Sequence, residues 1–303
     1  DNANSLSNNY LNALEAFPNG DVLVGTDGSG LDWFNRESGT FTHFKKTVNN
    51  EADDRSNYIY SLLVTENAIY VGTANGLYIY DFRDNRLVHR MRKQTIDGEE
   101  KFFVVFELEK GMNGEVWAAT NQGLYRLLGT EILPESVPQR VNYYCDNLFY
   151  LPGSGMWIAD ERGGIHLFPD GNLNKKDEEI IDYFNDKQIT TIQGNANELW
   201  LSSDGNGLFK ADLNSGKIEN IRASDEALSL KDDKLRSLLL NDDGILFLGT
   251  SYSGLQILNT ESQPISTYRK DVSGNHKFYP AGPVCESFDG TWYVGTISGL
   301  CAV

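Results

Sequence analysis

A short apolar run, a small residue and a tight turn recur seven times along the chain. The first unit reads VLVGTDGSGL and ends at Leu31, and the second reads IYVGTANGL and ends at Leu77. The small residues stand 40 to 47 positions apart and are Gly25, Gly72, Ala119, Ala159, Ser202, Gly249 and Gly295. A repeat of about 40–50 residues is the length of a four-stranded propeller blade. The spacing therefore predicts seven blades.

Each unit also shows the pattern expected of four short strands. In the second unit, apolar or alternating runs cover 58–64, 69–71, 77–81 and 86–90. Turn residues such as Thr65-Glu66-Asn67 separate the first two runs. Runs of this length between turn signals are typical of strands joined by hairpins. We expect four antiparallel strands per unit.

The central run of each unit is apolar on both faces. Ile69 and Val71 share one face of the strand in the second unit, and Tyr70 points to the other face, because side chains alternate along a strand. The residues equivalent to Tyr70 are also apolar: Leu23, Trp117, Trp157, Trp200, Phe247 and Tyr293. No helical periodicity is present to cover such a strand. A propeller covers it, since each blade packs between two others.

The chain is therefore predicted to be all-β, a single seven-bladed β-propeller over residues 1–303. The approximate blades are 1–49, 50–97, 98–138, 139–184, 185–227, 228–275 and 276–303. The last blade ends at Val303 after a third strand. Either the segment from Asp1 to Ser7 supplies its outer strand, or this blade keeps an exposed edge.

Written as apolar-aromatic-apolar-Gly-Thr-x-x-Gly-Leu, the unit resembles the two-component regulator propeller repeat. Units two, six and seven match best, through Gly72-Thr73, Gly249-Thr250 and Gly295-Thr296. The segment SLSNNY at 5–10 is similar to that family's entry into a first strand. Unit four departs most, with Ala159-Asp160 and an inserted Arg162-Gly163. The resemblance covers the whole chain.

This resemblance implies a non-catalytic, periplasmic sensor region of a hybrid two-component histidine kinase and response regulator. In that family, the sensor responds to oligosaccharides released from complex carbohydrates. It also implies that the ring adjoins a further propeller or β-domain of the same polypeptide and that the ectodomain forms a homodimer. The kinase and the DNA-binding output would lie outside these 303 residues.

The charge balance excludes some partners. The chain has 26 Lys and Arg against 43 Asp and Glu, a net charge of −17. Nucleic acids and anionic membrane surfaces attract basic proteins, so neither is an expected partner. A strongly anionic glycan is disfavoured unless the basic stretch from Arg90 to Lys93 contacts it. The cysteines Cys145, Cys285 and Cys301 show no CxxC spacing, so we expect unpaired thiols and no zinc site.

Candidate ligand-binding residues lie where turns depart from the repeat. In propellers, the turn between the second and third strands opens on the same face as the loop between blades. Carboxylates, guanidinium groups, amides and aromatic rings there could bind a sugar. The candidates are Asp160, Arg162, Asp204, Asn206, Tyr252, His276 and Tyr279. The sequence DGNG at 204–207 is also simply good turn chemistry. Trp117, Trp157 and Trp200 share one repeat position, which favours packing over sugar binding.

We identify no catalytic constellation, metal site or cofactor motif. His43, His89 and His166 fall on expected outer strands of different blades, and no D-x-D-x-D-G calcium loop occurs. Two alternative functions remain open. A protein-interaction scaffold would show an apolar patch on one face. A propeller lyase or glycosidase would bring two carboxylates, such as Asp160 and Asp204, together at the central mouth.

Overall fold

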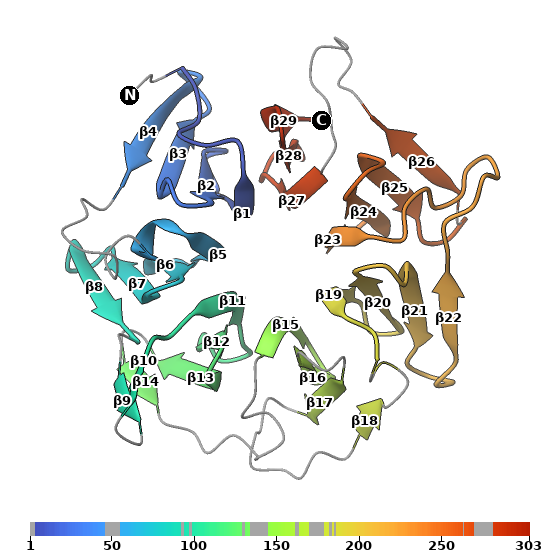
Figure 1. Cartoon of the computed structure of the whole chain (residues 1–303), viewed down its shortest axis with the longest axis horizontal. Helices are drawn as coiled ribbons and strands as arrows, with labels where there is room; N and C mark the ends of the chain where they lie inside the picture. The colour runs from blue at the N-terminus through green and yellow to red at the C-terminus, as the bar shows by residue number, and fades with distance from the viewer. Residues whose placement is uncertain are drawn as a thin grey trace.

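The computed structural model is a ring of seven β-sheets around a central axis (Figure 1). It describes residues 4–45, 55–91, 94–96, 99–128, 131–133, 145–160, 164–169, 179–181, 184, 186–262, 264–269 and 281–303. The protein is thus a seven-bladed β-propeller, as the repeat predicts. Within these ranges, no helix is long and apolar enough to cross a membrane.

Six blades have four antiparallel strands in chain order. Blade 1 is β1 (Leu11–Ala16), β2 (Val22–Thr26), β3 (Leu31–Asn35) and β4 (Thr40–Phe44), and blade 2 is β5 (Ile59–Val64), β6 (Ala68–Thr73), β7 (Gly76–Asp81) and β8 (Arg86–Arg90). Blade 3 is β11 (Val105–Lys110), β12 (Val116–Thr120), β13 (Gly123–Leu128) and β14 (Glu131–Leu133). Blade 4 is β15 (Cys145–Leu151), β16 (Gly155–Asp160), β17 (Ile165–Pro169) and β18 (Glu179–Ile181).

Blade 5 is β19 (Ile189–Gly194), β20 (Glu198–Ser203), β21 (Leu208–Asp212) and β22 (Ile218–Ile221), and blade 6 is β23 (Leu235–Leu240), β24 (Ile245–Thr250), β25 (Leu255–Asn259) and β26 (Ile265–Tyr268). Blade 7 has three strands, β27 (Ala281–Glu286), β28 (Trp292–Thr296) and β29 (Gly299–Ala302). A 3-10 turn, η1 (Arg55–Asn57), precedes β5. The hairpin β9 (Gln94–Ile96) and β10 (Glu99–Lys101), between blades 2 and 3, was not predicted.

Each blade packs on both neighbours. In β12, Val116 and Ala118 join a cluster with blade 2, whereas Trp117 and Ala119 join a cluster with blade 4. Seven such clusters of described residues occupy the seven interfaces between blades. The prediction that the second strand is buried on both faces is confirmed. Trp117, Trp157 and Trp200 are at most 1% exposed, so their shared position serves packing.

The Gly-Thr-x-x-Gly pattern has a local cause at each of its positions. A Cβ on Gly25 would lie 2.6 Å from Ile59 Cγ2 of the next blade, so a larger residue would push the blades apart. Thr73 Oγ1 donates to Gly76 O at 2.9 Å and accepts from Asn75 N at 3.0 Å, which closes the turn. Gly76 has a φ of 87°, a region that L side chains rarely adopt.

Blade 7 lacks a fourth strand within the described residues. Two backbone hydrogen bonds between Val303 and Trp292 extend the pairing of its third strand. The shorter one measures 2.8 Å from Val303 N to Trp292 O. Residues 4–10 form no strand, and Leu6 packs in the cluster between blades 7 and 1. Of the two closures considered from the sequence, the described residues show the one with a three-stranded blade. Cys285 and Cys301 are both buried.

Candidate functional site

Two kinds of loop share one face of the ring, which we call the upper face. They are the turns between second and third strands and the segments that enter each blade. Asp27, in the turn after β2, forms a β-bridge with Tyr58, just before β5. Asp204 and Lys234 form the equivalent bridge between blades 5 and 6. The two kinds of loop therefore open on the same face of the ring, as predicted.

Three of the candidate residues lie on the upper face of blades 5 and 6. Tyr252 is 71% exposed, and its backbone N donates to Asp232 Oδ2 at 2.7 Å. Asp204 Oδ1 is 3.8 Å from Lys234 Nζ, and Lys234 O accepts from Ser251 N. Lys234 thus connects the turn that carries Asp204 with the turn that carries Tyr252. Asn206 lies in the same turn as Asp204, and its carbonyl accepts a bond from Asn220 Nδ2.

Asp160 is engaged within its own blade. It occupies the place of the turn threonine, accepting from Gly164 N at 2.9 Å, and its other oxygen lies 2.9 Å from His166 Nε2. The placement of His166 on an outer strand is wrong: His166 is buried on the third strand, β17, directly after the turn. These contacts give Asp160 a local structural role. Arg162, His276 and Tyr279 lie outside the described residues.

A hollow of about 200 Å³ opens on the upper face near the ring axis, where blades 1, 6 and 7 meet. We call it the upper-mouth pocket. It is lined by Asn9, Tyr10, Leu11, Asn12, Asp27, Arg236, Gly282, Gly295, Thr296 and Ile297. Arg236 Nε donates to Ser251 Oγ at 3.0 Å, which fixes the guanidinium beside the Tyr252 turn. Tyr10 is 63% exposed, so its ring is accessible to a ligand. The pocket thus combines an aromatic ring with a guanidinium, amides and a carboxylate.

The residues of this mouth share a backbone device. Every innermost strand pairs with its second strand through a register shift near its start, as between Leu11 and Ala13 and between Leu235 and Ser237. A bulge re-aims the side chain of the extra residue. The bulge residues with described side chains are Asn12, Tyr60, Phe106, Thr190, Arg236 and, beside Gly282 in blade 7, Pro283. The innermost strands surround the ring centre in Figure 1, and two of these residues from different blades, Asn12 and Arg236, gather at the upper-mouth pocket.

Contacts between blades confirm this gathering. Asn12 Nδ2 donates to Ile59 O at 3.0 Å, and the rings of Tyr60 and Phe106 are 6.1 Å apart. Thr190 Oγ1 donates to Leu235 O at 3.0 Å. These residues were not among the predicted ligand-binding residues, because the predicted ones were all expected in turns and loops. The available signal was the position after the first residue of each innermost strand, where the blades carry side chains as different as those of Asn12, Phe106 and Arg236.

Three glutamates line the innermost strands below the mouth. Glu15 accepts from Val64 N at 3.2 Å, and Glu109, at the equivalent position of blade 3, accepts from Tyr150 N at 3.4 Å. Each bond therefore reaches the backbone of the following blade. Glu107 accepts from Ser61 Oγ at 3.1 Å. Burial raises the pKa of Glu15 and of Glu107 to about 7, and burial and the Glu107 charge raise that of Glu109 to about 8.

These carboxylates bear on the alternative of a propeller enzyme. The pair suggested from the sequence, Asp160 and Asp204, belongs to separate turns of blades 4 and 5. The carboxylates near the axis are instead Glu15, Glu107 and Glu109, which interact electrostatically with one another. No group of three His, Cys, Asp or Glu side chains in the described ranges is arranged to hold a metal ion.

Solved structures share this fold at low sequence identity. The extracellular domain of a putative hybrid two component system from B. thetaiotaomicron is 20% identical, with a TM-score of 0.79. That of a putative one component system from the same organism is 17% identical, with a TM-score of 0.72. The alignment covers 100% of this chain and 40% of each of those chains. The chain thus corresponds to less than half of either extracellular domain.

An enzyme also shares the ring. Virginiamycin B lyase from Staphylococcus aureus is 14% identical with a TM-score of 0.69, and the alignment covers 99% of this chain and 96% of the lyase. No family model and no curated protein matches the sequence. The similarities therefore establish the propeller fold, which hosts sensor domains and enzymes alike.

Proposed function

We propose that this propeller is a ligand-binding, non-catalytic part of the periplasmic sensor region of a two-component regulator. The observation that carries the proposal is the similarity over the whole chain to two extracellular sensor-system domains. The repeat pattern, which resembles the two-component regulator propeller repeat, supports the same function. The kinase, the neighbouring β-domain and a homodimeric arrangement of the full receptor belong to the proposal as well.

The ligand we propose is an oligosaccharide bound at the upper-mouth pocket. Tyr10 offers an aromatic face, Arg236 offers charged donors, and Asn12 and Asp27 offer an amide and a carboxylate. This set matches the apolar faces and the hydroxyl groups of a sugar. Because the pocket joins blades 1, 6 and 7, a bound sugar would contact three blades. The ligand would act on signalling through its differential affinity for two arrangements of the receptor.

Isothermal titration of the ring and of the full ectodomain with plant, host and microbial oligosaccharides tests this proposal. For the saccharide that binds, Arg236→Ala should weaken affinity tenfold or more, since a charge-assisted hydrogen bond contributes about 1.5–3 kcal/mol. Arg86→Ala is the matched control, because Arg86 is an exposed arginine on β8 far from the axis. Silence of the full ectodomain toward the whole panel would overturn the proposal and favour a protein-interaction scaffold.

A lyase or glycosidase is the second candidate function. The glutamates near the axis, with their raised pKa values, favour it, because enzymes use such carboxyls as acids and bases. Chromatography of the incubated saccharides distinguishes the two functions. If products form and the Glu107→Gln variant forms none, the ring is an enzyme. If the saccharides stay unchanged, the ring binds them without catalysis.

A further inference from the structure

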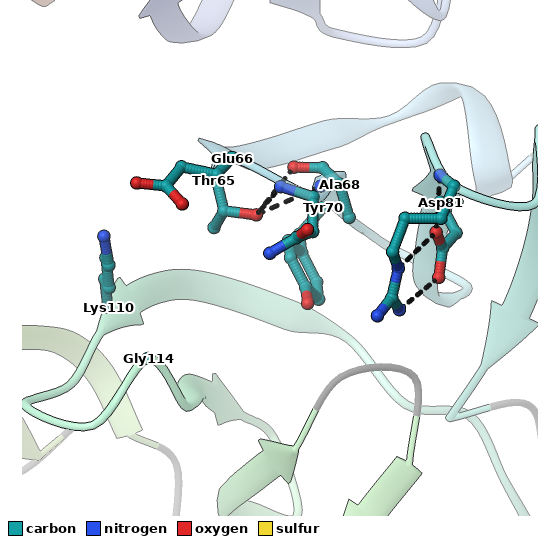
Figure 2. Close-up of a pocket in the computed structure, with 9 residues that line it drawn as sticks. Thr65, Glu66, Ala68, Tyr70, Asp81, Lys110 and Gly114 are labelled. Atoms are coloured by element: carbon teal, nitrogen blue, oxygen red, sulfur yellow. Dashed lines mark hydrogen bonds and ion pairs between the residues drawn. The ribbon is translucent and has the colours of Figure 1, made fainter.

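A second hollow lies on the other face of the ring, which we call the lower face and which carries the turns between first and second strands. It occupies about 230 Å³ between blades 2 and 3, and Figure 2 shows its walls. One wall is the turn between β5 and β6, with the ends of β6 and β7, and the other is the end of β11 and the turn after it. The lining residues are Thr65, Glu66, Asn67, Ala68, Tyr70, Asp81, Arg83, Lys110 and Gly114. We call it the lower-face pocket.

One ion pair in this pocket is complete. Asp81 is 2% exposed, and both of its oxygens accept from the Arg83 side chain, at 3.2 Å from Nε and 2.9 Å from Nη2. These hydrogen bonds lower the pKa of Asp81 to about 2, so the aspartate stays charged. The Arg83 charge is thereby neutralised while its guanidinium is held at the edge of the pocket.

Two further charges face the pocket from different blades. Glu66 belongs to blade 2 and Lys110 to blade 3, and both side chains are exposed. Figure 2 shows the Glu66 carboxylate and the Lys110 ammonium extending from the two walls on the same side of the pocket. Neither group has a salt bridge within the described part of the chain, and none joins them to each other. Among the described residues, the pocket therefore presents one positive and one negative charge that take part in no ion pair.

The rest of the pocket is preorganised. Thr65 Oγ1 accepts from Ala68 N at 3.1 Å and donates to Ala68 O at 3.1 Å, which fixes the turn that carries Glu66. Tyr70 lies between Lys110 and Asp81 in the view of Figure 2 and is 5% exposed, so its ring forms a rigid base. Three other blades carry the larger tryptophan at this position. A binding site that needs no reordering loses less affinity to entropy.

We propose that the lower-face pocket binds a small zwitterion of amino-acid size, with its carboxylate on Lys110 and its ammonium on Glu66. Two opposite charges on facing walls match a ligand that carries both charges a few bonds apart. The volume lies below the range of about 300–1,000 Å³ that is usual for drug-sized ligands, which restricts the ligand to a small molecule. Since the ligand would bridge blades 2 and 3, its binding would stabilise the folded ring.

Thermal unfolding and isothermal titration of the ring with L-alanine test this proposal, with acetate and methylammonium as probes of single charge. We expect L-alanine to raise the unfolding midpoint and to bind at least tenfold tighter than either single-charge probe. Lys110→Met and Glu66→Gln should each weaken L-alanine binding tenfold or more. The exchanged pair, Glu66→Lys with Lys110→Glu, should restore it in the reverse orientation.

Two controls keep this result separate from the oligosaccharide proposal. Lys217→Met removes an exposed lysine of blade 5 and should leave L-alanine binding unchanged, as should Arg236→Ala in the upper-mouth pocket. Circular dichroism of each variant establishes that the ring is folded. Binding of acetate as tight as that of L-alanine, unchanged binding by Glu66→Gln, or no binding by the folded wild-type ring would each overturn the proposal.

Discussion

Glu15, Glu107 and Glu109 make the stability of the ring depend on protons. Their carboxyls have pKa values of about 7, 7 and 8, against 4.5 without the protein environment. Between pH 5 and pH 8, roughly, the folded ring therefore holds protons that the unfolded chain has released. Their contribution to the free energy of unfolding is fully present below the unfolded pKa and is lost as pH rises through the folded values.

Glu109→Gln tests this linkage. Glutamine keeps an oxygen that can accept the bond from Tyr150 N, but it removes the charge. At pH 8 we expect the free energy of unfolding to rise by about 1–3 kcal/mol, and at pH 5 to change little. Urea unfolding at both pH values measures this, with the exposed Glu37→Gln as control. An equal effect of Glu109→Gln at both pH values would contradict the assignment.

The environment of individual side chains was the feature of the structure that could least be predicted from the sequence. Glu15 reads as one polar residue in an apolar strand, and nothing local shows that this strand lies at the centre of a ring. The same holds for Arg236, because its position depends on a bulge and on a hydrogen bond to Ser251 in the turn after β24. Asp204 and Tyr252 were placed on the correct face, since turn position follows directly from the repeat.

At the level of strands and turns, the repeat motif is explained by close backbone approach. Gly254 has a φ of 84°, and a Cβ there would lie 2.3 Å from Tyr268 O on the neighbouring strand. Gly39 also has a positive φ, of 67°, but a Cβ there would meet nothing within 4 Å. A side chain at Gly39 would therefore reduce stability only through the unfavourable dihedral angle, whereas one at Gly254 would also collide with the backbone of the neighbouring strand.

Gly254→Ala should therefore destabilise the ring far more than Gly39→Ala. We expect a loss of about 1 kcal/mol for Gly39→Ala, from the dihedral angle alone, and a loss larger by about 2 kcal/mol or more for Gly254→Ala. Chemical denaturation of both variants measures the difference. Equal losses would show that the strand beside Gly254 yields to the added methyl group.

Strands were predicted well because two independent signals agreed, the 40–47 residue period and the burial of second strands on both faces. The hairpin of β9 and β10 was not predicted, since it belongs to one interval between blades and has no counterpart in the repeat. The bulges were invisible for another reason. A shift of pairing register changes no residue type, so the apolar pattern reads the same with or without it.

For the whole molecule, closure of the ring depends on packing between the first and last blades. The chain passes directly between each pair of consecutive blades, but blades 7 and 1 meet only through contacts. These include the cluster that contains Val24 and Tyr293 and the ion pair between Arg36 and Asp289. We therefore expect this interface to open before the others.

Val24→Ala and Val116→Ala compare two such interfaces. Both valines are at most 1% exposed, Val24 between blades 7 and 1 and Val116 between blades 2 and 3. Each substitution should cost about 2 kcal/mol of global stability. Hydrogen exchange should rise selectively in blades 1 and 7 for Val24→Ala, with no matching local rise for Val116→Ala. Similar exchange patterns in both variants would contradict preferential opening.

Because of the bulges at the start of the innermost strands, residues at the mouth can change without a change in the clusters between blades. A substitution at Asn12, Tyr60, Phe106, Thr190 or Arg236 alters the chemistry of the mouth, while the clusters between blades keep their members. These five blades thus each contribute one side chain to the mouth, and each of these side chains can be changed while the clusters between blades stay the same. A library randomised at Tyr60, Phe106 and Arg236, with Asn12 and Thr190 kept for their hydrogen bonds to the next blade, should yield rings of similar stability and divergent ligand preference, which makes this propeller a scaffold for engineered recognition.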